Sequence, residues 1–243
     1  IRLVIGRGWG QGPEHSQSLE AVFAHFPGLK VIMPCFPYEA KGLLTAAIED
    51  KNPVIFIEHR WLHFAQGEVP TGYFKLPLES LNKITTGEHM TLVTTSISTL
   101  EALRAVNFLK KYGIKIDFFN LRVLRPLNLN KLYNSIKKTK KILTVDTGFI
   151  KHGIGAEIIS SLVEKEIVKN LKVRRLGLPD FPTPSSRGLI KNYYPSALNI
   201  IENCMNLLGT DKNKIAKIKK EFIKQDSSNL PIDIPHPSFK GPF

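Results

Sequence analysis

Apolar runs alternate with amphipathic stretches along the first 62 residues. Ile1 to Ile5 is a short β-branched run that stops at a glycine-rich segment, as a strand entering a tight turn does. Apolar residues at three-and-four spacing predict helices, and continuous apolar runs predict strands of a parallel sheet that is covered on both faces. The predicted strands are 1–5, 29–33 and 54–57, and the predicted helices are 16–24 and 38–50.

The pattern weakens between residues 63 and 88, where glycine and proline interrupt it, and it becomes regular again near residue 90. The predicted strands there are 90–95, 115–121, 142–145 and 173–176, and the predicted helices are 99–112, 132–137, 154–166 and 196–208. We therefore predict an α/β fold with a partial parallel-sheet domain (1–62), a linker (63–88), a second α/β domain (89–208) and a basic, proline-rich tail (209–243). We expect the tail to bury little apolar surface.

Composition favours a soluble protein with a packed core, since 42% of the residues are hydrophobic and 23% are charged. No apolar run approaches the ~18 residues of a membrane span, and no signal-peptide layout is present, so we expect a cytoplasmic protein without membrane contact. Cys35 and Cys204 lack metal-binding spacing and are expected to be buried. The chain begins with Ile1 inside an apolar run, from which we expect further sequence before it.

The net charge of +13 raises the question of nucleic-acid binding. The lysines are spread along the chain, without a basic stripe interleaved with aromatic residues, so we expect no nucleic-acid partner.

His15 is the best candidate for catalysis. It lies beside the glycine-rich loop in Glu14-His15-Ser16-Gln17, a polar cluster that enters a predicted helix. Backbone amides and a titratable imidazole at such a place can meet an anionic ligand. The alternative is that Ser16 or Glu14 caps the helix and His15 is an ordinary polar residue. The loop itself is a weak nucleotide motif, because it matches neither GxGxxG nor a P-loop.

Asp146, His152 and Glu157 form a second polar group in the later half. They can be interpreted as an acid–base constellation. The favoured interpretation is structural: Asp146 and the neighbouring glycines shape a turn, while Glu157 lies on a helix that packs against a partner subunit.

Several motifs, taken in order and spacing, resemble the β subunits of thiamine-diphosphate-dependent 2-oxoacid dehydrogenases, from about Ile1 to Leu208. In the first half they are His15-Ser16-Gln17-Ser18-Leu19-Glu20, Pro27-Gly28-Leu29-Lys30-Val31, Pro37-Tyr38-Glu39-Ala40-Lys41-Gly42-Leu43-Leu44 and Asn52-Pro53-Val54-Ile55. In the second half they are Leu121-Arg122, Leu124-Arg125-Pro126-Leu127, Asp146-Thr147-Gly148, Gly153-Ile154-Gly155-Ala156-Glu157-Ile158 and Pro179-Asp180.

The resemblance implies a partial transketolase-like pyrimidine-binding domain followed by a transketolase C-terminal domain. It implies thiamine diphosphate shared with an α subunit, which also holds magnesium, and an α and a second β subunit in a heterotetramer. The implied activity is decarboxylation of pyruvate or a related 2-oxoacid and acylation of a lipoyl-bearing acyltransferase. The family's cofactor-activating glutamate lies before the segment that matches Ile1.

The resemblance also assigns roles to residues. His15 matches a family histidine at the mouth of the cofactor site, where it orients the substrate or takes part in acylation of the lipoyl group. The family usually has Gln before this histidine, whereas this chain has Glu14. Ala47, Ile48, Asp50 and Asn52 match positions that can hold a structural potassium ion at a helix end. An ordinary helix stop at Asn52-Pro53 explains the same residues equally well.

Two other functions stay open at this point. One is ketol transfer between sugar phosphates, as in transketolase or deoxyxylulose-phosphate synthase. The other is a non-catalytic scaffold subunit, which Glu14 and the expected missing front segment keep possible.

Overall fold

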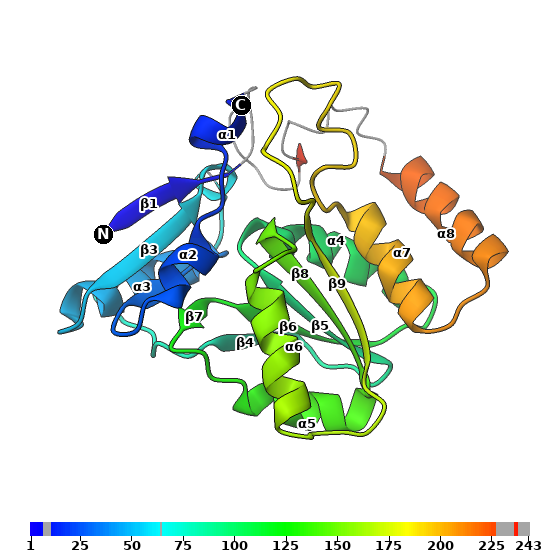
Figure 1. The fold of residues 1–243 in the computed structure, drawn as a ribbon, viewed down its shortest axis with the longest axis horizontal. Helices are drawn as coiled ribbons and strands as arrows, with labels where there is room; N and C mark the ends of the chain where they lie inside the picture. Colours follow the sequence, from blue (N-terminus) through cyan, green and yellow to red (C-terminus); the bar gives the residue numbers. More distant parts are fainter. Residues whose placement is uncertain (7–10, 64, 227–235, 238–243) are drawn as a thin grey trace.

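A computed structural model describes residues 1–6, 11–63, 65–226 and 236–237 of the chain. Figure 1 shows two β-sheets, each with helices packed against it, that lie next to each other. This arrangement agrees with the predicted α/β class. Within the described residues, no helix combines the length and the apolar character needed to cross a membrane.

The first sheet has the strand order β1-β3-β2-β7. Strands β1 (Arg2–Ile5), β3 (Val54–His59) and β2 (Lys30–Ile32) are parallel, as predicted, because helices cover both of their faces. Helix α2 (Glu20–His25) packs on one face through Phe23, and helix α3 (Pro37–Glu49) packs on the other through Leu43. Val31 and Ile32 point to opposite faces, as alternation along a strand requires.

The helix predicted over 16–24 is wrong in its first part. The structure has a four-residue helix α1 (Gly12–His15), an irregular stretch over 16–19, and then α2. Serine hydroxyls compete with the helical hydrogen bonds of the backbone, and Ser18 donates to the Glu20 carboxylate at 2.5 Å. The polar residues 16–18 therefore break the helix that the apolar spacing indicated.

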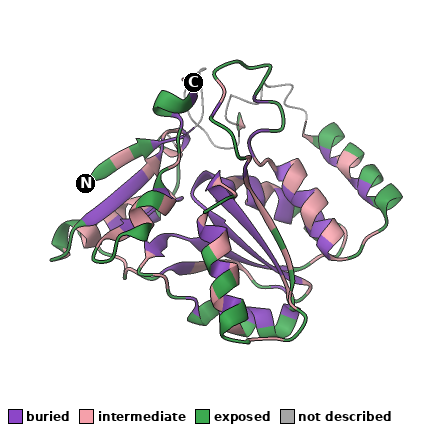
Figure 2. Ribbon diagram, viewed as in Figure 1, coloured by how far each residue is buried: buried purple, intermediate pink, exposed green. Residues whose placement is uncertain are grey.

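The second sheet has the order β4-β6-β5-β8-β9, in which only β4 runs antiparallel to its neighbour. The strands are β4 (Leu81–Thr85), β5 (Met90–Thr95), β6 (Ile116–Leu121), β8 (Lys141–Phe149) and β9 (Lys172–Leu178). Every residue of β5 and β6 is buried, which Figure 2 shows at the centre of the molecule. The stretch 63–88, expected as a linker, thus contains a strand of this sheet.

Helices cover both faces of the second sheet. Helices α4 (Ile97–Lys110) and α7 (Ala197–Leu207) share one apolar cluster. Helices α5 (Asn130–Thr139) and α6 (Ile154–Glu164) pack on the other face, in a cluster that also includes Ile5, Val31 and Ile57 of the first sheet. The two halves therefore share a continuous apolar core, which was not predicted.

Two further connections join the halves. Strand β7 (Val123–Arg125) leaves the second half and pairs antiparallel with β2. Glu39 on α3, whose side chain is 2% exposed, accepts hydrogen bonds at 2.9 Å from the amides of Asn82 and Asn120 in the second sheet. Arg122 lies 3.5 Å from the same carboxylate. These donors compensate the cost of burying a charged group at the junction.

The prediction that residues after 209 bury little apolar surface is wrong for the next segment. Helix α8 (Lys212–Gln225) packs on α7 and buries Ile215, Ile218 and Phe222. These residues lie three and four positions apart and form one face, while the lysines between them stay in solvent. The high lysine content of this segment led us to predict a polar tail where the chain forms an amphipathic helix.

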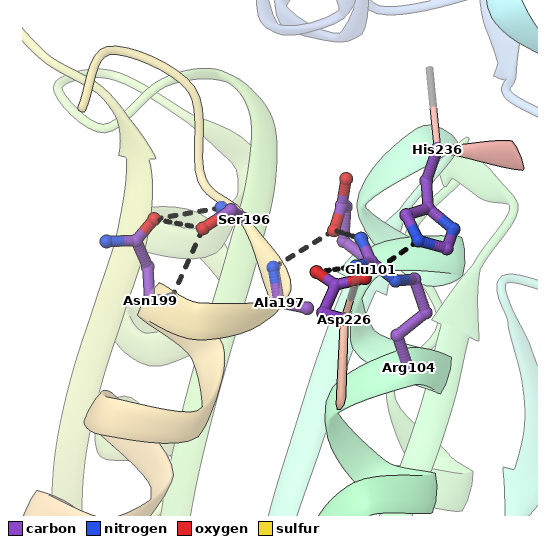
Figure 3. Close-up of polar contacts among 7 residues, drawn as sticks. All are labelled: Glu101, Arg104, Ser196, Ala197, Asn199, Asp226 and His236. Atoms are coloured by element: carbon purple, nitrogen blue, oxygen red, sulfur yellow. Dashed lines mark hydrogen bonds and ion pairs between the residues drawn. The ribbon is translucent and has the colours of Figure 1, made fainter. Parts of the chain in front are cut away.

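A polar network fixes the end of α8 against its neighbours, as Figure 3 shows. Arg104 on α4 binds Asp226 at 2.5 Å and Glu101 at 2.9 Å, and Glu101 also accepts from the backbone N–H of Ala197 at 3.0 Å. His236 Nε2 lies 2.8 Å from the second oxygen of Asp226. The network links α4, the start of α7 and the end of α8.

Candidate active site

The candidate site lies at the carboxyl ends of β1 and β3. In open α/β sheets this edge is where ligands usually bind. Gly6 follows β1 with a φ of +118°, and a Cβ on it would lie 2.6 Å from Nε2 of His59, the last residue of β3. Glycine is therefore required for the close approach of the loop to that ring. Gly8 and Gly10 of the predicted loop lie outside the described residues, whereas Gly12 is the first residue of helix α1.

His15 is the last residue of α1, beside this edge. Its imidazole is 59% exposed, and its Nε2 lies 4.0 Å from the carboxylate of Glu14, which is itself 83% exposed. An exposed pair of this kind contributes little to stability. The contact with Glu14 therefore constrains the imidazole little, and the exposed ring is accessible to a bound molecule.

Arg60 holds the backbone of the segment that carries His15. It lies in the short 3-10 helix η1 (Arg60–Leu62), which follows β3. Its Nη2 donates to the backbone carbonyl of His15 at 2.8 Å, and its Nη1 donates to the side-chain oxygen of Gln11. Partial burial lowers the pKa of Arg60, and the nearby Tyr194 opposes that effect. Arg60 was not predicted as a site residue, because its two partners are 45 and 49 residues away in the chain.

A small cavity of about 20 Å³ lies behind this edge, between the two halves. Gly6, Ser16 and His59 line it from the first half, and Ser98 and Asp146 line it from the second. A volume of this size holds about one water molecule. The second half therefore forms the rear wall of the candidate site. Gly12 of the first half also lies close to the second half, since a Cβ on Gly12 would lie 2.2 Å from Ser185 Oγ.

Two buried carboxyl groups lie at this junction. Asp146 accepts hydrogen bonds from Gly155 N–H at 3.0 and 3.1 Å, and burial raises its pKa to about 7, with the nearby Glu20 adding to the rise. Burial also raises the pKa of Glu20, against the hydrogen bond from Ser18. Glu20 approaches Gly148 so closely that a Cβ there would lie 2.5 Å from its oxygen. Glu20 comes from the first half and Asp146 from the second. The stability of the junction between the halves should therefore depend on the protonation of these two carboxyl groups.

The expectation that Asp146 shapes a turn is wrong, because it lies inside β8 and is buried. Its carboxylate binds the first turn of α6 instead of a loop. His152 and Glu157 are exposed, and Glu157 accepts from Ser161 on its own helix at 3.3 Å. Asp146 is thus buried, whereas His152 and Glu157 lie in solvent. A structural role for these three residues fits this arrangement better than a shared acid–base role.

The predicted potassium residues meet at the end of α3. Ala47 and Ile48 lie in its last turn, Asp50 is the C-cap, and Asn52 donates to Asp50 through both its backbone N–H and its side chain at 2.9 Å. The ammonium of Lys30 binds the other oxygen of Asp50, and these contacts lower the pKa of Asp50 to about 2. A cation of the protein thus already lies beside this carboxylate, and the potassium site stays a prediction.

Residues that commonly bind transition metals do not gather elsewhere. Within residues 1–6, 11–63, 65–226 and 236–237, no group of three or more His, Cys, Asp or Glu side chains is placed to hold a metal ion. Cys35 and Cys204 are both free and buried, as predicted.

Comparison with known proteins assigns both halves. Residues 2–63 match the transketolase pyrimidine-binding domain, and residues 80–200 match the transketolase C-terminal domain. Together these matches take in well over half of the chain. The protein therefore belongs to the transketolase-like family, with one domain of each kind.

Its curated relatives include β subunits of an acetoin oxidoreductase and of 2-oxoacid dehydrogenases. It is 37% identical over 202 residues to the β subunit of acetoin:2,6-dichlorophenolindophenol oxidoreductase from Cupriavidus necator, covering 82% of this chain and 60% of that one. It is 35% identical to the pyruvate dehydrogenase E1 component subunit beta of Porphyra purpurea, covering 87% and 64%. It is 34% identical to the 2-oxoisovalerate dehydrogenase subunit beta of Bacillus subtilis, covering 86% and 64%.

The chain therefore spans less than two thirds of the length of these relatives. Among solved structures, it is similar to a split-gene transketolase described as an inactive β4 tetramer, with a TM-score of 0.70 and 19% identity over 87% of this chain and 67% of that one. This likeness supports the fold. The predicted resemblance to 2-oxoacid dehydrogenase β subunits is confirmed by the relatives.

Proposed function

We propose that this chain is part of the β subunit of a thiamine-diphosphate-dependent 2-oxoacid dehydrogenase. The observation that carries the proposal is the position of His15, an exposed imidazole at the carboxyl edge of a pyrimidine-binding domain whose relatives are dehydrogenase β subunits. Identities of 34 to 37% to these relatives favour it over sugar-phosphate ketol transfer.

The residues of this chain fit one wall of a shared cofactor cleft. The edge that carries His15 is open, while its backbone is held by Arg60 and its rear is closed by the second half. Thiamine diphosphate, when bound, supplies the electron sink for loss of carbon dioxide. The remaining wall, with the diphosphate and magnesium, belongs in this proposal to an α subunit, in a heterotetramer with a second β subunit.

The role of His15 in this proposal is to position the 2-oxoacid or to move a proton during acyl transfer to a lipoyl group. An imidazole can do either, because each ring nitrogen can donate or accept depending on protonation. Arg60 acts as a positioning residue, since it contacts the His15 backbone and not its ring.

The test is an assay of the full-length β subunit, including the proposed segment before Ile1 that carries the cofactor-activating glutamate, combined with its α partner, thiamine diphosphate, magnesium and a lipoyl domain. We expect cofactor-dependent decarboxylation of pyruvate or a branched-chain 2-oxoacid. The His15→Asn variant should lose roughly a hundredfold in lipoyl acylation, the lower range for removing a positioned acid–base group. His152→Asn is the matched control, because His152 is exposed and its φ of +57° suits asparagine.

The same assay separates the alternatives. Turnover of sugar phosphates without 2-oxoacid decarboxylation would replace the proposal with ketol transfer. Saturable assembly with the α partner but no cofactor binding by calorimetry would indicate a scaffold subunit. Equal losses in His15→Asn and His152→Asn would remove the catalytic role of His15.

A further inference from the structure

A second cleft lies at the opposite end of the second sheet from the candidate active site. It has a volume of about 600 Å³ and is formed where β5 and β8 begin, between the end of α5 and the start of α8. Figure 1 shows the arrow of β8 running away from α5, toward the edge that Asp146 and Thr147 line. The volume is in the range of small-molecule sites.

One side of this cleft is strongly basic. Lys138, Lys140, Lys141 and Lys214 line it, whereas Glu88 is the one acidic residue among the described residues of the lining. Glu88 already pairs with Lys115 at 3.4 Å. Lys138 pairs with the buried Asp117 at 3.5 Å and also lies in the last turn of α5, where it offsets the helix dipole.

Lys140, Lys141 and Lys214 are the surplus positive charges. Within the described part of the chain, none of the three ammonium groups has a carboxylate within 4.0 Å. Lys141 is in register with Lys172 of the adjacent parallel strand, so two like charges are cross-strand neighbours. Such a pair is destabilising unless an anion lies close to it.

The backbone fixes the position of Lys140. Its φ is +52°, its N–H donates to Ile136 at 2.9 Å, and its carbonyl accepts from Lys172 N–H at 3.1 Å. Hydrogen bonds on both sides of Lys140 therefore hold its backbone in this conformation, which fixes where its side chain leaves the chain at the basic side of the cleft.

The other side of the cleft is apolar. Ile114, Met205 and Leu208 line it, together with the ring of Tyr112. The Tyr112 hydroxyl donates to the Glu221 carboxylate, which raises the pKa of Tyr112 to about 12, so that the phenol stays neutral. A neutral, held ring can pack against a flat organic group.

We propose that this cleft binds an organic polyphosphate, with its phosphates on the three surplus lysines and its organic group on the apolar side. Lysine is a common partner of phosphate, and several such charges at one place favour a multiply charged anion. The combination of a basic side and an apolar side selects a nucleotide-like molecule over a bare anion. The site is separate from the candidate active site and does not depend on the proposed function.

The test uses calorimetry on the full chain with ATP, inorganic triphosphate and adenosine as probes. We expect saturable binding of ATP, weaker binding of triphosphate, and weakening of both by salt, because exposed charges are screened. The Lys140→Gln, Lys141→Gln, Lys214→Gln triple variant should bind ATP roughly tenfold less tightly, as expected for three exposed ion pairs. These residues are not inside the core, and Lys214→Gln alone, with a loss of roughly threefold, serves if the triple variant does not fold.

The matched control is Lys217→Gln, Lys220→Gln, Lys224→Gln, which removes the same charge from exposed positions of α8 outside the cleft. Its ATP affinity should stay within about twofold of the parent. Equal losses in the two triple variants, or no saturable heat with ATP, would overturn the site. Triphosphate binding as tight as ATP would overturn the role of the apolar side, and tighter binding of a hexaglutamate peptide would overturn the small-molecule assignment.

Discussion

The two halves of the molecule use the same layered plan but leave different parts of it open. In the first half, β1 is an edge strand with Val4 52% exposed, and Val22 of α2 and its C-cap Phe26 are each more than half exposed. In the second half, all of β5 and β6 is buried, and α8 adds a further helix outside α7 over one face. The second half therefore buries its central strands completely, whereas the first half leaves apolar side chains of its edge strand and of the α2 region in solvent.

The buried Phe222 gives the largest expected effect and tests whether α8 belongs to the core of the second half. Its ring packs against Phe108 with centroids 5.0 Å apart. Phe222→Ala should lower the free energy of unfolding by about 3 kcal/mol, since it removes a large side chain from a packed cluster. Urea unfolding followed by circular dichroism measures this. Ile223→Ala, at a side chain 57% exposed, is the control and should change little.

The junction between the halves should respond to pH. The folded pKa of Asp146 is about 7 against an ordinary 3.8, so the folded protein binds this proton more tightly than the unfolded chain does. The stabilising contribution is therefore present below the ordinary pKa and is lost as pH rises through about 7. We expect this loss to be on the order of 2 kcal/mol between about pH 5 and pH 8. Glu20 shifts in the same direction.

Urea unfolding at several pH values measures this effect, with Asp146→Asn as the test variant and Asp180→Asn as the control. Asparagine can still accept from Gly155 but does not titrate, so the loss of stability with pH should shrink in Asp146→Asn. Asp180 is exposed and binds Lys151 at the surface. An unchanged pH slope in Asp146→Asn would show that the carboxyl pair does not control the junction.

The smallest expected effect concerns local strain in the second half. Ser96, between β5 and α4, has φ +47° and ψ −129°, and its buried hydroxyl has no hydrogen-bond partner among the described residues. Ser96→Gly should raise the free energy of unfolding by about 1 kcal/mol, because glycine adopts this conformation without strain. Ser160→Gly, in the exposed face of α6, should instead lower it by about the same amount. Thermal unfolding of both variants distinguishes the two signs.

Much of the fold followed from local patterns. Apolar runs and helical spacing predicted β2, β3, α3, α4 and α6 with ends within a few residues, because each buries a periodic face. The errors occur where side chains compete with the backbone or where charge hides periodicity. Residues 16–19 leave the helix because of Ser16 and Ser18, and α8 was missed because lysines surround its apolar face.

The candidate site was predictable only in part. His15 was identified from its polar cluster and from the resemblance to known β subunits. Arg60 and Glu20 were not, since Arg60 acts on a backbone 45 residues away and Glu20 meets a carboxyl from the other half. Arg60 has no local sequence pattern that distinguishes it from an ordinary surface charge, and Glu20 appeared only as the end of a family motif, which assigned it no role at the site.

The α/β class, most of the individual elements and the family could be inferred from the sequence alone, because these depend on periodic burial and on motifs that are contiguous along the chain. The three-dimensional fold was needed to show that β7 joins the first sheet, that α8 completes the second core, and that Asp146 and Glu20 meet at the junction. Each of these depends on a contact between residues far apart in the chain, which the local sequence does not specify. Burial of apolar surface favours the first two contacts, and the third follows from how the two halves pack together.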